Sequence, residues 1–188
     1  MLSRRVFLLS AFAVPGLSLL QRRAIGSELA ASKVLVLTEG ICGDTRAFAG
    51  CLPASQFEAD PGPMLLELDK SFKEGEFDLV FGLSRDSNFM LVEQYAQASR
   101  YQLHYHGIHK YGATGLSHSL QGNSEVIKYL SKNLPTVNKD WTDAVSQIPA
   151  LSEYQDRQLL KAKIGSSHVC PEQSSGLLVS WLFKRSIS

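Results

Sequence analysis

The chain has 188 residues, 44% of them hydrophobic, and its nineteen basic and eighteen acidic residues leave a formal net charge of +1. Such a balance, without a concentrated basic region, excludes the electrostatic signature of a nucleic-acid or anionic-membrane binder. The length suits one domain with a sizeable core, and it is too short for a typical two-lobed solute receptor.

The N-terminal segment has the three parts of an export signal: a charged start, an apolar middle and a small-residue exit. Arg4 and Arg5 stand directly before Val-Phe-Leu, and an apolar stretch follows. The segment resembles the S-R-R-x-F-L core of bacterial twin-arginine signals. Small residues beyond the apolar stretch offer a cleavage site after residue 26, or as late as residue 32. The resemblance implies a signal peptide over residues 1–26.

This signal implies a destination and two transient partners. The twin-arginine translocase and a signal peptidase would release a soluble domain into the periplasm, without a stable membrane anchor. An uncleaved anchor is one alternative, but the apolar stretch is shorter than the roughly 20 residues that a spanning helix needs. An ordinary secretory signal is another, and the paired arginines argue against it. Loss of four arginines leaves fifteen basic and eighteen acidic residues, a net charge of −3.

The cysteines Cys42, Cys51 and Cys170 would meet an oxidising compartment after export. Cys42 and Cys51 are near each other in the sequence and could close a small loop. Cys170 could pair with either, pair between chains or stay free. Spacing alone therefore leaves the connectivity open.

The first half of the mature chain has two strand signals, each followed by a helix signal. The apolar run at residues 33–38 predicts a buried strand, and Gly43-Asp44-Thr45 offers the start of a short helix. After a turn, Pro63 suits the first position of a second helix. Residues 77–82 predict the next strand, and residues 84–88 lead into a helix with a stripe of Phe89, Val92 and Ala96. This order is typical of a β-α-β arrangement.

The second half predicts a hairpin and then mainly helices. Residues 102–110 and 116–121 flank the glycine-containing loop 112–115, which predicts a β-hairpin. A helix capped by Asn123 and ended by Pro135 follows, with further helices at residues 141–147 and 151–163 and a closing strand at residues 177–183. We therefore expect a single three-layer α/β domain over residues 33–188, with a mixed sheet that combines a parallel βαβ part with the hairpin.

Polar residues follow both predicted strands, where ligands of open α/β sheets gather. A helix N-terminus beside Arg85 would favour a small anionic or polar ligand there. Helix capping and turn geometry are the alternative explanation for each residue taken alone. The predicted ligand-binding residues are Glu39, Asp44, Arg46, Ser84, Arg85, Asp86, Ser87 and Asn88.

The hairpin register predicts a pair of histidines. If Tyr111 faces Leu116, His109 lies opposite His118, with their Cβ atoms roughly 5 Å apart. Two such imidazoles can begin a zinc or copper site, to which His168 could add a ligand. Packing and hydrogen bonding within the hairpin are the alternative. Leu103, Tyr105 and Leu120 are predicted to share the face of the pair, which would bury it in part.

Three classes of function follow from these signals, and whether the protein is an enzyme stays open. The first is a periplasmic domain that binds a small polar or anionic ligand at the ends of its first two strands. The second is a small metal-dependent or hydrolytic enzyme that uses His109 and His118 with Asp44 or Asp86. The third is an envelope protein-interaction module that docks through the hairpin tyrosines Tyr101, Tyr105 and Tyr111.

Overall fold

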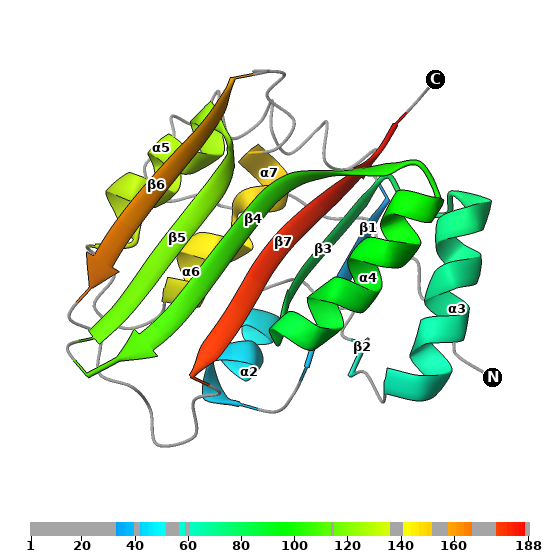
Figure 1. Cartoon of the computed structure of the whole chain (residues 1–188), viewed down its shortest axis with the longest axis horizontal. Helices are drawn as coiled ribbons and strands as arrows, with labels where there is room; N and C mark the ends of the chain where they lie inside the picture. Colours follow the sequence, from blue (N-terminus) through cyan, green and yellow to red (C-terminus); the bar gives the residue numbers. More distant parts are fainter. Residues whose placement is uncertain are drawn as a thin grey trace.

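A mixed β-sheet forms the middle of the protein (Figure 1). The computed structural model describes residues 33–39, 42–51, 57–58, 61–113, 115–135, 141–151, 158–166 and 176–186. In these ranges the sheet has seven strands in the order β2-β1-β3-β7-β4-β5-β6. β1 is parallel to both β2 and β3, and every other neighbouring pair is antiparallel. The strands are β1 (Val34–Thr38), β2 (Phe57–Glu58), β3 (Leu79–Ser84), β4 (Tyr101–Gly112), β5 (Gly115–Asn123), β6 (Leu159–Ser166) and β7 (Leu177–Arg185).

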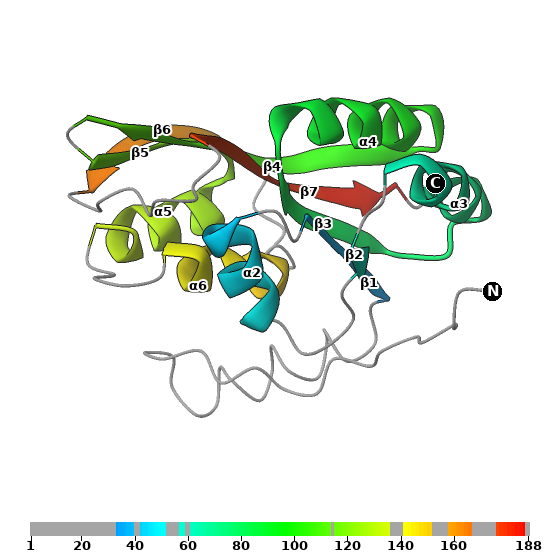
Figure 2. The same ribbon diagram turned by 90° about the horizontal axis from the view of Figure 1, so that it is seen from below.

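Helices cover both faces of this sheet (Figure 2). α3 and α4 pack on one face through one apolar cluster, and α2, α5, α6 and α7 pack on the other through a second cluster. The expected three-layer α/β architecture with a mixed sheet is confirmed. Within the described ranges, no helix combines the length and apolar character needed to cross a membrane. The helices are α2 (Gly43–Gly50), α3 (Pro61–Glu74), α4 (Asp86–Ala98), α5 (Ser124–Asn133), α6 (Trp141–Ser146) and α7 (Ile148–Leu151).

The last strand in the sequence, β7, occupies the centre of the sheet between β3 and β4. Its middle residues are buried, because helices cover both of its faces. Trp181 of β7 lies over Gly82 of β3, where a Cβ atom would come within 2.7 Å of the indole ring. Glycine at this position therefore lets the large ring pack flat against the neighbouring strand.

Most predicted elements are confirmed with small shifts of their ends. α4 buries the expected stripe of Phe89, Val92 and Ala96. The side chain of Asn123 caps α5 by accepting a hydrogen bond from the backbone N–H of Glu125 at 2.8 Å. The helix predicted to begin at Pro63 begins at Pro61, and α2 begins at Gly43 as expected, with Cys42 as its N-cap.

The helix predicted at residues 151–163 is wrong. α7 ends at Leu151, and β6 begins at Leu159 and pairs with β5. In residues 159–165 apolar side chains face the core at every second position and lysines alternate with them, which is the period of a strand. A short apolar segment can match both periods, and pairing with β5 decides this one.

A β-bulge corrects one predicted face of the hairpin. The pairing of β4 with β7 shifts between Leu103 and Tyr105, which places an extra residue in β4. Leu103 therefore lies opposite Phe183 and is 40% exposed, on the face away from His109. A bulge reverses the alternation of side chains on one side of it, and the sequence pattern contains no marker for it.

The geometry of α2 excludes one cysteine pairing. Cys42 and Cys51 are the N-cap and the C-cap of this eight-residue helix. A helical rise of 1.5 Å per residue separates such positions by about 13 Å, whereas a disulfide needs Cα atoms within about 7 Å. The Cys42 thiol is buried and lies 3.4 Å from the Thr45 hydroxyl oxygen. Cys170 lies outside the described residues.

Candidate functional site

The β4–β5 hairpin brings His109 and His118 together in the predicted register. Tyr111 faces Leu116, and His109 is directly opposite His118. The two Nδ1 atoms are 2.7 Å apart, and the exposed fractions of His109 and His118 are 1% and 0%. The pair is thus completely buried rather than partly so, because α6 covers it on the helical side.

A chain of hydrogen bonds extends from this pair toward the middle of the sheet. The Nε2 atom of His109 is 2.6 Å from the hydroxyl oxygen of Ser180, which is 3.0 Å from the hydroxyl oxygen of Tyr105. Burial raises the pKa of Tyr105, so its phenol stays protonated and can donate to Ser180. Ser180 then donates to Nε2 of His109, and the Nδ1–H of His109 donates to His118. With this orientation each of the three hydrogen bonds has one donor and one acceptor.

Trp141 of α6 joins this chain to a second polar group. Its indole ring lies 4.3 Å from the His109 ring, centroid to centroid. Its Nε1–H donates to the hydroxyl oxygen of Tyr111, at 3.3 Å. Tyr111 in turn donates to the Asp44 carboxylate, at 3.1 Å. The buried histidine cluster therefore consists of Asp44, Tyr105, His109, Tyr111, His118, Trp141 and Ser180.

Burial decides the charge state of the central histidine. It holds the pKa of His109 well below its usual value, and the nearby rings of His118 and His106 act in the same direction. His109 is therefore a neutral imidazole at neutral pH. A neutral ring can donate at Nδ1 and accept at Nε2, which matches the proton arrangement of the chain.

The spacing of the pair is that of a direct hydrogen bond. Zn²⁺ binds histidine nitrogens at roughly 2.0–2.1 Å, so two ligands of one tetrahedral ion lie about 3.3 Å apart. The Nδ1 atoms of His109 and His118 are closer than that, at 2.7 Å. Among the described residues, no group of three or more His, Cys, Asp and Glu side chains is arranged to hold a metal ion. His168 lies outside these residues, so the zinc or copper site stays a prediction.

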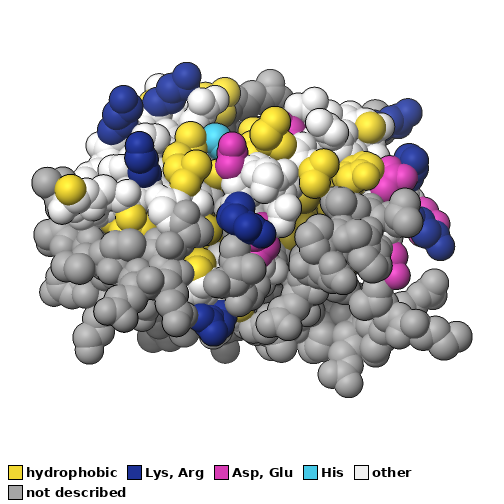
Figure 3. Space-filling view, turned by 60° about the horizontal axis from the view of Figure 1, so that its bottom comes forward, with side chains coloured by type: hydrophobic (Ala, Val, Ile, Leu, Met, Phe, Trp, Pro, Cys, Tyr) yellow, Lys and Arg dark blue, Asp and Glu magenta, His cyan; other side chains and the backbone are white. Residues whose placement is uncertain are grey.

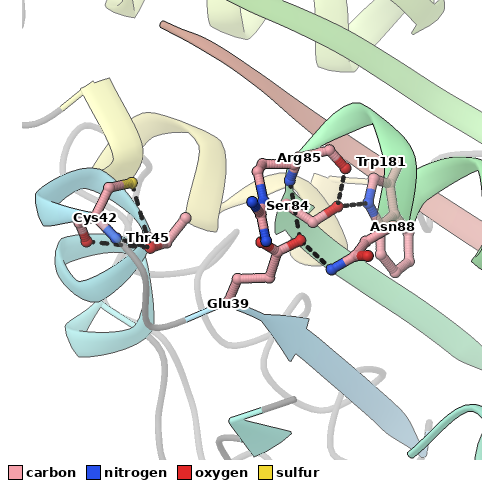
Figure 4. A network of polar contacts seen from close by, with 7 residues as sticks. All are labelled: Glu39, Cys42, Thr45, Ser84, Arg85, Asn88 and Trp181. Carbon is pink, nitrogen blue, oxygen red and sulfur yellow. Dashed lines mark hydrogen bonds and ion pairs between the residues drawn. The ribbon is translucent and has the colours of Figure 1, made fainter. Parts of the chain in front are cut away.

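A second polar cluster lies where β1 and β3 end, and Figure 4 shows its contacts. The buried Glu39 carboxylate accepts from the backbone N–H of Arg85 at 3.1 Å and from its Nε–H at 2.9 Å. The side-chain amide of Asn88 donates to the same carboxylate. Glu39 thereby places a negative charge at the N-terminus of α4, where helix geometry favours an anion.

The predicted neighbours of Glu39 divide into buried and exposed residues. Ser84 is buried; its hydroxyl donates to the backbone carbonyl of Arg85 at 3.1 Å and accepts from the indole N–H of Trp181 at 3.3 Å. Asp86 and Ser87 are exposed in the first turn of α4. No side chain caps α4 at its N-cap, Arg85; the Glu39 carboxylate, which follows β1, accepts a hydrogen bond from the Arg85 N–H instead. We call Glu39, Ser84, Arg85 and Asn88 the strand-end cluster.

The structure does not bring Asp44 and Arg46 to this cluster. Both belong to α2, which packs on the face of the sheet opposite to α4 (Figures 2 and 4). Asp44 joins the buried histidine cluster instead, and the exposed Arg46 donates from Nε to the backbone carbonyl of Cys42 at 3.3 Å. The predicted crevice thus divides between two faces, because α2 and α4 pack on opposite sides of the sheet.

Two residues of the histidine cluster have no part in the sequence-based site. Ser180 is the one polar residue in the apolar run 177–183, and a buried hydroxyl in such a run needs a partner. This pattern could have identified Ser180 from the sequence. The approach of Trp141 to His109 has no local signal, since α6 and the hairpin meet through tertiary packing.

The hairpin tyrosines do not form a docking surface. Tyr101 is buried and donates to the backbone carbonyl of Phe77 at 2.6 Å, and Tyr105 is buried in the histidine cluster. Tyr111 is half-buried against Asp44 and Trp141. These rings contribute to the core, so an envelope interaction module, which stays a prediction, would need a different surface.

No family of proteins, no curated protein and no solved structure has significant similarity to this chain.

Proposed function

We propose that the chain is an exported binding domain whose ligand, a small anion, docks on Arg85 at the ends of β1 and β3. The observation that carries this proposal is the way Arg85 is held. Its Nε–H is bound to Glu39, a buried residue, while the Arg85 side chain is 53% exposed. Its terminal guanidinium nitrogens make no hydrogen bond or ion pair with the described residues.

Glu39 prepares Arg85 for this role. A guanidinium that is already oriented loses less conformational entropy on binding than a free one. Its planar fork matches the two oxygens of a carboxylate or a phosphate. Glu39 accepts only from the Nε–H of the guanidinium. A ligand can therefore bind the terminal nitrogens of Arg85 without displacing Glu39.

The exposed neighbours narrow the class of ligand. Asp86 and Ser87 lie beside Arg85 in the first turn of α4. The Asp86 carboxylate repels ligands of high negative charge, and Ser87 offers a hydroxyl partner. A small carboxylate that also bears a hydroxyl or amino group fits this combination.

The N-terminal segment supports the cellular setting of this proposal. Arg4 and Arg5 direct the chain to the twin-arginine translocase, and cleavage by a signal peptidase releases it into the periplasm. Replacing both with lysine should leave the uncleaved precursor in the cytoplasm, as immunoblots of cell fractions would detect. Export of this double variant at the normal rate would contradict the twin-arginine route.

Binding can be tested by NMR titration of the purified protein with glycolate, glycine and inorganic phosphate. Glycolate or glycine should shift the Arg85 Nε–Hε resonance at lower concentration than phosphate. Arg85→Lys keeps the charge but removes the fork, and it should weaken binding about tenfold. Arg100→Lys, at the other end of α4, is the matched control. Equal binding by both variants, or no shift with any probe, would overturn the proposal.

A further inference from the structure

The outward face of β5, β6 and the second half of β4 is not covered by a described helix (Figure 1). α3 and α4 cover the same side of the sheet over β1, β3, β7 and the first half of β4, where Phe89 of α4 stacks on His106. The exposed face carries the lysines Lys110, Lys161 and Lys163. Its other outward residues are Ile108, Ser117, Ser119, Gln121, Leu159 and Gly165.

The positive charge of this face has no acidic partner within it. Lys163 lies opposite Ser119, Lys161 opposite Gln121, and Lys110 opposite Ser117. The outward residues of these three strands include no Asp or Glu, although opposite charges commonly pair across strands. Figure 3 shows basic side chains gathered at the upper left, over this part of the sheet, with no acidic side chain among them.

β6 is an edge strand whose two faces differ in chemistry. In the described ranges it pairs with β5 alone. Lys161 and Lys163 point outward and are exposed, whereas Leu160, Ala162 and Ile164 point toward the core and remain half-exposed. An edge strand leaves alternate backbone N–H and C=O groups ready to pair with another strand.

We propose that the β6 edge binds an extended peptide segment of a partner protein in which acidic and apolar residues alternate. Such a segment adds an eighth strand to the sheet. Its acidic side chains lie beside Lys161 and Lys163, and its apolar side chains cover Leu160, Ala162 and Ile164. The backbone supplies affinity, and the two faces supply the specificity.

The same lysines decide against a second copy of the chain at this edge. Pairing of two β6 strands would place lysines of one copy near lysines of the other, which is unfavourable. An acidic strand would instead place carboxylates near these lysines, which is favourable. The charge pattern of β6 therefore disfavours self-association and favours an acidic partner.

The first test measures binding of a short blocked peptide that alternates valine and glutamate to the purified protein. The double variant K161E/K163E should weaken binding at least about tenfold and should gain affinity for a peptide that alternates valine and lysine. The matched control is K70E/K73E on α3, which changes the net charge equally and lies away from β6. It should bind the glutamate peptide as the wild type does.

The second test separates strand addition from simple charge attraction. Two versions of the glutamate peptide are N-methylated, one at the glutamates and one at the valines. In a strand only one of these sets points its N–H groups toward β6, so only one version should lose binding. Polyglutamate without alternation should bind at least about tenfold more weakly than the alternating peptide.

Three results would overturn the proposal. The first is wild-type binding by K161E/K163E, and the second is equal binding of both N-methylated peptides. The third is a stable dimer in light scattering that K161E/K163E abolishes, since this edge would then belong to a second copy. Strand addition is supported if only one N-methylated peptide loses binding and if K161E/K163E gains affinity for the peptide that alternates valine and lysine.

Discussion

The buried histidine cluster and the strand-end cluster are both polar networks, but they differ in their exposure to solvent. In the first, His109 and His118 are buried and hydrogen-bonded to each other. In the second, Glu39 is buried but its partner Arg85 remains half exposed. Both join residues far apart in the sequence. Only the second leaves charged donors facing water.

This difference separates a structural role from a binding role. A buried hydrogen-bond network presents no exposed group to a ligand, and removing one member leaves unpaired polar groups inside the protein. A half-exposed arginine whose Nε is already held can exchange bound water for a ligand with little loss of conformational entropy. The histidine cluster should therefore respond mainly through stability, and the strand-end cluster mainly through binding.

The largest effect is expected from Gly107→Ala in β4. An added Cβ atom would collide with the Tyr105 hydroxyl and come within 2.7 Å of the Ser180 hydroxyl oxygen. Displacing both breaks the buried chain, so the free energy of unfolding should fall by about 3 kcal/mol. Urea denaturation measures it. Gly165→Ala in β6 is the control, since a Cβ atom there meets nothing within 4 Å. Equal stability of both variants would contradict the assigned chain.

Glu39→Ala should have the next largest effect on stability. It removes the acceptor of the Arg85 backbone N–H, the Arg85 side chain and the Asn88 amide. We expect a loss of about 2 kcal/mol in the free energy of unfolding, measured by the same denaturation. Glu67→Ala, an exposed position on α3, should change it little. A Glu39 variant as stable as the wild type would mean that this carboxylate does not hold the start of α4.

A pH dependence tests the neutral state of His109. Burial, reinforced by His118 and His106, holds its pKa well below 6.5, so below that pH the unfolded chain takes up a proton that the folded chain does not. Stability from His109 is therefore full above pH 6.5 and decreases as the pH falls below it, by up to about 1.4 kcal/mol per pH unit. Chemical denaturation between about pH 7.5 and pH 5 measures this slope.

The variant His109→Gln should flatten that slope, whatever its stability at neutral pH. His106→Gln is the comparison, because burial lowers the pKa of the half-buried His106 as well and its variant should flatten the slope less. If both variants kept the wild-type dependence of stability on pH, the folded protein would accept the proton on His109 without losing stability.

The smallest effect is expected at Ser87, an exposed residue beside the strand-end cluster. Ser87 is exposed and makes no hydrogen bond with the described residues, so Ser87→Ala should change the free energy of unfolding by less than about 0.5 kcal/mol. The same variant should weaken glycolate binding in the NMR titration. A large loss of stability would place Ser87 in the fold and would remove it from the proposed ligand contacts.

The hairpin was the most predictable part of the fold and of the candidate site. Its short loop and alternating residues place His109 opposite His118, and the structure has that register. Loop length and alternation are local properties, so they are visible in a single sequence. The bulge after Leu103 is not, because it arises where β4 adjusts to β7.

The structure brings together only some residues of the predicted ligand crevice, for a related reason. The rule that strand ends gather polar residues correctly brought Glu39, Ser84, Arg85 and Asn88 together. It could not tell that α2 and α4 pack on opposite faces, which takes Asp44 away from the other four. Pattern reasoning finds the end of a strand, whereas the side of the sheet depends on how each helix buries its apolar face.

The sequence by itself determined the α/β class, most of the helices and strands, and the histidine pair, because periodicity, caps and turns act between near neighbours. Only the tertiary structure decided that β7 lies in the centre, that β6 is an edge strand and that the histidines are sealed beneath Trp141. These outcomes depend on which strands pair with each other when long stretches of chain separate them in the sequence. That choice reflects the total apolar area buried and every backbone hydrogen bond satisfied, and no local pattern contains it.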